Sequence, residues 1–148
     1  MIAHIRIQPE DFDLNDEIEA LTEKTTGIGA VASFVGVVRA EDGLTALTLE
    51  HYPGMTEKQI AACVEDANTR WPLLGVTIIH RIGTLTPGTR IVLVAVAAPH
   101  RGAAFLACEF LMDYLKTRAP FWKREDRETE TSWVEPRTSD AEAAARWK

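Results

Sequence analysis

The longest apolar run in the chain, Ile91–Pro99, constrains the fold most strongly. A run of this length suits a strand that is buried on both faces, whereas a helix that crosses a bilayer needs about 20 residues. Soon after it, Gly102–Arg118 has the clearest helical pattern of the sequence. The apolar stripe of this helix consists of Phe105, Cys108, Met112 and Leu115. A buried strand followed by an amphipathic helix predicts a layered domain in which helices pack on a sheet.

The remaining apolar patterns predict short strands interspersed with helices. Further helices are expected over Asp13–Lys24, Thr56–Trp71 (opened by a capping box of Thr56 and Gln59) and Asp140–Trp147 (capped by Ser139). Strands are expected over Ile2–Ile7, Ala30–Val38, Leu44–Tyr52, Val76–Ile82, Ile91–Ala98, Phe121–Arg124 and Thr131–Val134. The turn signal Glu41–Gly43 predicts a hairpin between the second and third strands. This order indicates the α+β class: one domain over residues 1–148, with a mainly antiparallel sheet and flanking helices.

Charge and cysteine usage limit the possible partners and compartment. The formal net charge of −6 argues against a nucleic-acid binder, which normally carries a basic excess. Cys63 and Cys108 belong to no CxxC pair and fall on apolar helical patterns, so we expect them to be reduced core residues. No segment is typical of a membrane span, and no spacing is typical of a metal site. We therefore expect a cytoplasmic protein without a metal or a cofactor.

The first candidate site is Pro99–Gly102, where the buried strand ends and the long helix begins. A helix N-terminus attracts anions, and His100 and Arg101 add positive charge there. This pattern is typical of a phosphate or carboxylate site. An exposed loop with a solvated arginine explains the same residues equally well.

The second candidate is a pair of lysines, Lys116 and Lys123, on either side of Pro120. A turn at the proline would fold the chain back and bring both ammonium groups to one pocket. Like charges in a buried pocket lower each other's pKa, which produces a lysine that can exchange protons near neutral pH. In the alternative interpretation Lys116 only complements the helix dipole and Lys123 is solvated.

The third candidate is Arg39, directly after a buried strand, where an arginine either marks the surface or binds a phosphate with two hydrogen bonds. The histidines His4, His51 and His80 alternate with strand residues and are interpreted as structural. No nucleophile motif, P-loop or GxGxxG is present. The residues alone thus indicate a domain that binds a small anionic substrate, and they name no reaction.

Four blocks of the sequence resemble the molybdopterin synthase large-subunit family. These are Phe34–Arg39 (FVGVVR), Leu47–Met55 (LTLEHYPGM), His80–Gly83 (HRIG) and Met112–Arg124 (MDYLKTRAPFWKR). They occur in the family's order and lie within residues 29–137. The last block is long and of unusual composition, so it is the most specific of the four.

The resemblance implies a reaction and an assembly. The family converts cyclic pyranopterin monophosphate into molybdopterin, taking sulfur from the thiocarboxylated Gly-Gly tail of a small ubiquitin-like subunit. It works as a homodimer of large subunits within a heterotetramer. Because the partner brings the sulfur, neither cysteine is needed for catalysis.

The resemblance also implies site residues. Lys116 and Lys123 match the catalytic lysines; we expect Lys116 to steer the thiocarboxylate and transfer protons, and Lys123 to stabilise charge on the substrate. The implied substrate-binding residues are Val37, Val38, Arg39, His100, Arg101, Lys116, Lys123, Arg124, Glu125 and Arg137. His100 and Arg101 are expected to come from the other protomer, and Arg137 is also expected to contribute across the dimer.

The sequence departs from the family's pattern beside Arg39. Val37 stands where a lysine is common, and the loop Ala40–Gly43 is shorter than in many relatives. Two rival interpretations stay open: a non-catalytic dimeric scaffold that binds the small subunit or a pterin, and a hydrolase of phosphorylated heterocycles. Retention of both lysines argues against the scaffold, and no activated-water site is evident for the hydrolase.

Overall fold

The computed structural model describes residues 1–135 and 137–148 as a layered α+β structure. Its first sheet has the strand order β1 (Ile2–Gln8), β4 (Gly75–Arg81), β6 (Arg90–Ala98) and β2 (Ala30–Val37). Strand β1 pairs with β4 in parallel, and the other two pairings are antiparallel. The expected α+β class with a mainly antiparallel arrangement is therefore confirmed.

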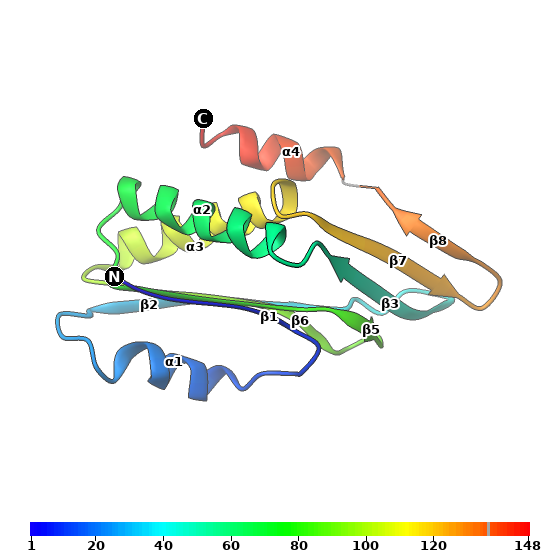
Figure 1. Cartoon of the computed structure of the whole chain (residues 1–148), viewed down its shortest axis with the longest axis horizontal. Helices are drawn as coiled ribbons and strands as arrows, with labels where there is room; N and C mark the ends of the chain where they lie inside the picture. Colours follow the sequence, from blue (N-terminus) through cyan, green and yellow to red (C-terminus); the bar gives the residue numbers. More distant parts are fainter. Residues whose placement is uncertain (136) are drawn as a thin grey trace.

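Helices cover both faces of this first sheet (Figure 1). Helix α1 (Leu14–Thr22) packs on one face, and α2 (Met55–Arg70) and α3 (Arg101–Thr117) pack on the other. Successive side chains of β6 point to opposite faces of the sheet, so the strand can be buried on both faces. Its even-numbered residues Val92–Ala98 face α2 and α3, whereas Leu93, Ala95 and Ala97 face α1.

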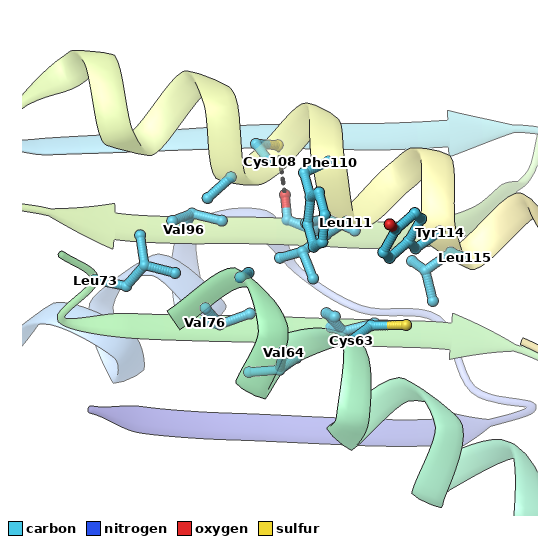
Figure 2. Packing of buried hydrophobic residues seen from close by; sticks show 14 of the residues in the cluster. Cys63, Val64, Leu73, Val76, Val96, Cys108, Phe110, Leu111, Tyr114 and Leu115 are labelled. Atoms are coloured by element: carbon cyan, nitrogen blue, oxygen red, sulfur yellow. Dashed lines mark hydrogen bonds between the residues drawn. The ribbon is translucent and has the colours of Figure 1, made fainter. Parts of the chain in front are cut away.

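The core between the sheet and α2 and α3 contains both cysteines (Figure 2). Cys63 on α2 and Cys108 on α3 are buried and free, as predicted, and the Cys108 thiol lies 3.8 Å from the carbonyl oxygen of Val94. Burial raises the pKa of Cys63, and burial together with Glu109 raises the pKa of Cys108 to about 11. Both thiols therefore stay protonated and are poor nucleophiles.

A second, fully antiparallel sheet has the order β5 (Gly83–Leu85), β3 (Leu44–His51), β7 (Phe121–Arg127) and β8 (Thr131–Val134). The predicted hairpin between β2 and β3 is wrong, because the two strands belong to different sheets. Strand β3 pairs instead with β7, at least 70 residues later, and with β5, a short strand that the sequence did not reveal. Such non-local pairings leave no local turn signal.

Three further details of the sequence prediction are corrected. Helix α2 has no capping box of Thr56 and Gln59; its N-cap is Gly54, whose backbone N–H donates a hydrogen bond to the Glu57 carboxylate at 3.1 Å. The last helix, α4, spans Thr138–Ala145, so Ser139 lies inside it. On α3, Phe105 is 65% exposed, because the small residues Ala104 and Ala107 take the positions closest to the sheet. Within the described residues, no helix is long and apolar enough to span a membrane.

Candidate active site

A cavity of about 530 Å³ lies between the end of β2, the C-terminal end of α3 and one face of β7. This volume is in the range of cavities that bind small organic molecules. The charged residues around it are Arg39, Glu41, Lys116, Lys123, Glu125, Glu135, Arg137 and Asp140. The cavity therefore combines four cationic side chains with carboxylates, and it also has an apolar wall that includes Phe34, Val37, Val38, Met112 and Phe121.

Lys116 and Lys123 reach this cavity from two different elements. Lys116 lies in the last turn of α3, where positive charge also complements the helix dipole. The chain then turns at Pro120, and Lys123 comes from β7. The hydroxyl of Thr56 donates a hydrogen bond to the carbonyl oxygen of Pro120 at 3.0 Å, which ties this turn to the start of α2. The turn thus places both ammonium groups in one cavity.

The environment of Lys123 changes its proton affinity. Burial, followed by the like charge of Lys116, lowers the pKa of Lys123 from 10.5 to about 8. Asp140 opposes this effect, and Arg137 adds to it weakly. A lysine with a pKa this close to neutrality is suited to general acid–base chemistry, because both its protonated and neutral forms are accessible.

Arg39 stands at the mouth of the cavity, two residues after the end of β2. A register shift between Gly36 and Val37 bends the strand end. Val38 is buried, whereas Val37 is about half exposed. The Arg39 guanidinium lies 3.5 Å from the Glu41 carboxylate, and its side chain is 68% exposed. An exposed ion pair of this kind is weak, so an anionic ligand can replace Glu41 on Arg39.

Glu125 borders the cavity, whereas its neighbour Arg124 points away from it. Glu125 accepts a hydrogen bond from Arg127 at 2.7 Å, and Arg127 also bonds Glu41 at 2.9 Å. Arg127 thereby holds both carboxylates in place. Arg124 lies on the opposite face of β7, where it bonds Asp126 at 3.2 Å and approaches Thr48 at 3.5 Å. Within one chain, Arg124 is therefore separated from the cavity by its strand.

The structure also separates His100 and Arg101 from the lysines. They stand at the N-terminal end of α3, whereas Lys116 stands at its C-terminal end, about 22 Å away at 1.5 Å per residue. They can take part in this site only if a second copy supplies them. Arg137, by contrast, borders the cavity of its own chain at the start of α4.

Sequence reasoning missed several residues of the cavity. Phe34, Met112 and Asp140 border it, and nothing in their sequence pattern distinguishes them from core or surface residues. His80 also borders it and stacks on Phe121, with ring centroids 3.8 Å apart. A signal for His80 was present, because it follows Val76 and Ile78 at the two-residue spacing of one apolar strand face. Among the described residues, no group of three or more His, Cys, Asp or Glu side chains could hold a metal ion.

Fold and cavity together define a class of protein: an α+β domain with a cationic cavity of small-molecule size, bordered by a lysine with a lowered pKa. The comparisons with known proteins identify the family within this class. The model of the MoaE protein family matches residues 7–118, which is most of the chain. The chain belongs to the MoaE protein family.

Individual relatives agree over nearly the whole length. A molybdopterin synthase catalytic subunit of Mesorhizobium japonicum is 55% identical over 147 residues, covering 97% of this chain and 92% of the relative. The structure of molybdopterin cofactor biosynthesis protein E from Burkholderia multivorans superposes with a TM-score of 0.87 at 52% identity, covering 99% of this chain and 97% of that one. The structure of molybdopterin synthase from Staphylococcus aureus superposes with a TM-score of 0.80 at 32% identity, covering 87% of this chain and 95% of that one.

Proposed function

We propose that this chain is the catalytic subunit of a molybdopterin synthase and transfers sulfur to cyclic pyranopterin monophosphate, forming the dithiolene of molybdopterin. The sulfur donor is the thiocarboxylated C-terminus of a small ubiquitin-like subunit. Membership of the MoaE family and the names of its relatives support the enzyme class. The observation that carries the proposal is the placement of Lys116 and Lys123 in one cavity, with the pKa of Lys123 lowered to about 8.

The cationic groups of the cavity match the charges of the proposed reactants. A thiocarboxylate and a phosphate are both anions, and they bind best where preformed positive charge replaces their water. Lys116 is assigned to the thiocarboxylate. Arg39 and Arg137 are assigned to the substrate phosphate, because Arg39 has only an exposed, replaceable partner in Glu41.

The proton steps are assigned to Lys123 rather than to Lys116, which differs from the expectation drawn from the sequence. Sulfur addition to the pterin and release of the tail each need a proton to be taken up or given away. A group with a pKa of about 8 does this near neutral pH far better than an ordinary lysine. Glu125, fixed by Arg127, supplies a carboxylate on the same face of β7.

The assembly proposed is a heterotetramer: a homodimer of this chain with one small subunit at each end. The name "catalytic subunit" borne by the relative implies a further subunit in that enzyme. The family resemblance assigns His100 and Arg101 to this cavity, and their distance from Lys116 means that a second copy has to supply them there. The proposed compartment is the cytoplasm, in line with two buried free thiols.

A reconstituted assay tests this function. Purified protein is mixed with thiocarboxylated small subunit and cyclic pyranopterin monophosphate, and dithiolene product is followed over time. Lys116→Ala is the test variant, and Lys58→Ala, which removes an exposed lysine from α2, is its matched control. We expect product with the wild type and the control and almost none with Lys116→Ala. Tight binding of the small subunit without product from the wild type would favour the scaffold instead.

A further inference from the structure

His80 lies on a buried face of β4, where the neighbouring side chains are apolar. Along β4, the side chains of Val76 and Ile78 face α2 and α3, and His80 is the next residue on that face. It is 8% exposed and pairs across the sheet with Val92. A polar ring at such a position costs free energy unless its nitrogen atoms have partners. The partners of the two ring nitrogens therefore decide what His80 does.

One nitrogen has a backbone partner that fixes the tautomer. The Nδ1 atom lies 2.9 Å from the carbonyl oxygen of Arg81. A carbonyl oxygen only accepts hydrogen bonds, so Nδ1 carries the proton and donates it. Burial lowers the pKa of His80 to about 4, with smaller contributions from Lys123, Lys116 and His51, so the ring is neutral at pH 7. Nε2 then carries a lone pair and is an acceptor.

Phe121 fixes the position of the His80 ring, and this position indicates Lys123 as the hydrogen-bond donor to Nε2. The two rings are stacked at 3.8 Å with an angle of 18° between their planes. Lys123 follows Phe121 by two residues on β7, so both side chains lie on the same face of the strand, about 7 Å apart. His80, Phe121 and Lys123 all border the cavity. A lysine side chain spans that separation easily, which places its ammonium within reach of Nε2.

Lys123 also lacks a charged partner of its own. Within residues 1–135 and 137–148, neither Lys123 nor Lys116 forms an ion pair, and Nε2 of His80 forms no hydrogen bond. A half-buried ammonium beside a second ammonium is stabilised by a hydrogen-bond acceptor. Nε2 of His80 is such an acceptor, on the same wall of the cavity.

We propose that His80 is a positioning residue: rotation of the flexible Lys123 side chain brings its ammonium to the free Nε2, which accepts a hydrogen bond from it and fixes where the ammonium points in the cavity. Its effect on turnover rests on the proposed function, whereas the hydrogen bond itself does not. The charged and titratable groups that face this pair are Lys116 from α3, His51 from β3, and Asp140 and Arg137 from the start of α4. None of these groups is changed in the test variants.

Three variants separate the roles of the two ring nitrogens. His80→Gln keeps a polar atom near the position of Nε2. His80→Asn keeps a donor near Nδ1 for the Arg81 carbonyl and leaves nothing at Nε2. His80→Phe keeps only ring volume and stacking. The wild type and variants are labelled with ¹³C and ¹⁵N in lysine, and the pKa of Lys123 is read by NMR in the folded protein without substrate. The chain has only five lysines, so their signals are separable.

Loss of the acceptor at Nε2 destabilises the ammonium form of Lys123, so His80→Asn and His80→Phe should lower the pKa of Lys123 by about one further unit. His80→Gln keeps an acceptor there, so its Lys123 should have a pKa close to that of the wild type. An unchanged pKa in His80→Asn, or an equal decrease in all three variants, would overturn the proposal. If His80→Phe does not fold, the Asn and Gln variants decide. In the wild type, ¹⁵N shifts of His80 should show a protonated Nδ1 and a bare Nε2, and the opposite tautomer would also overturn the proposal.

The kinetic consequence is tested in the reconstituted assay. His80→Asn should decrease kcat with little change in KM for the pterin, because substrate anions are held by other residues. His80→Gln should recover part of the rate, which a purely structural role would not produce. The NMR titration uses no substrate, so its failure is distinguishable from failure of the proposed reaction.

Discussion

Replacing Lys123 by methionine should stabilise the folded chain while abolishing its proposed activity. The pKa of Lys123 falls from 10.5 to about 8 on folding, a difference of about 2.5 units. At 1.36 kcal/mol per unit, holding this lysine protonated in the fold costs up to about 3.4 kcal/mol at pH 7. Methionine has a similar length and no charge, so it removes this cost.

The pH dependence separates a charge effect from a packing effect. Between pH 8 and pH 10.5 the unfolded chain keeps the proton of Lys123 and the folded chain does not, so wild-type stability gains from this group as the pH rises. The advantage of Lys123→Met should therefore be largest, about 2–3 kcal/mol, at or below pH 7, and it should shrink toward pH 10.5.

Urea unfolding followed by circular dichroism at pH 7 and pH 9.5 measures both quantities. Lys58→Met, which changes an exposed lysine on α2, is the control and should leave stability nearly unchanged at both values. A Lys123→Met protein no more stable than the wild type at pH 7 would refute the reasoning. So would a gain of equal size at both pH values, because that result is typical of added apolar contacts alone.

Three other changes test the site and the core. Lys116→Ala should keep its circular dichroism spectrum and lose on the order of 100-fold in turnover in the reconstituted assay, since it removes the group assigned to the thiocarboxylate. Arg39→Ala should weaken substrate binding roughly ten- to hundredfold by calorimetry, as a charge-assisted contact contributes about 1.5–3 kcal/mol; unchanged affinity would contradict its role. Phe110→Ala should lower the free energy of unfolding in urea by about 3–5 kcal/mol, because this ring on α3 is fully buried against Trp71 and Trp147.

The sequence predicted most elements of the fold, because their patterns are local. The two-sided apolar run of β6 and the stripe of α3 were recognisable from spacing alone. The pairing of the strands was harder to predict from the sequence than the strands themselves. The β2–β3 turn signal indicated a hairpin, yet β3 joins a second sheet with β7 and β5. Phe105 was misplaced because the helical period gives the direction of the apolar stripe only to within one residue.

The candidate site was predictable only in part. The cationic residues Arg39, Lys116 and Lys123 stood out by charge, and the family resemblance gave them roles. The sequence could not show that Arg124 faces away from the cavity, because that depends on the register of β7. His80 was interpreted as structural, since its neighbours Phe121 and Lys123 lie 41 and 43 residues away and meet it only in the fold.

The most direct test of the proposed sulfur transfer is an isotope measurement. The small subunit is prepared with a ³⁴S-labelled thiocarboxylate and incubated with this protein and cyclic pyranopterin monophosphate, and the product is analysed by mass spectrometry. The proposed function predicts that both dithiolene sulfurs carry the label and that the small subunit loses it. Unlabelled product, or a labelled tail that stays intact while bound to the protein, would contradict it.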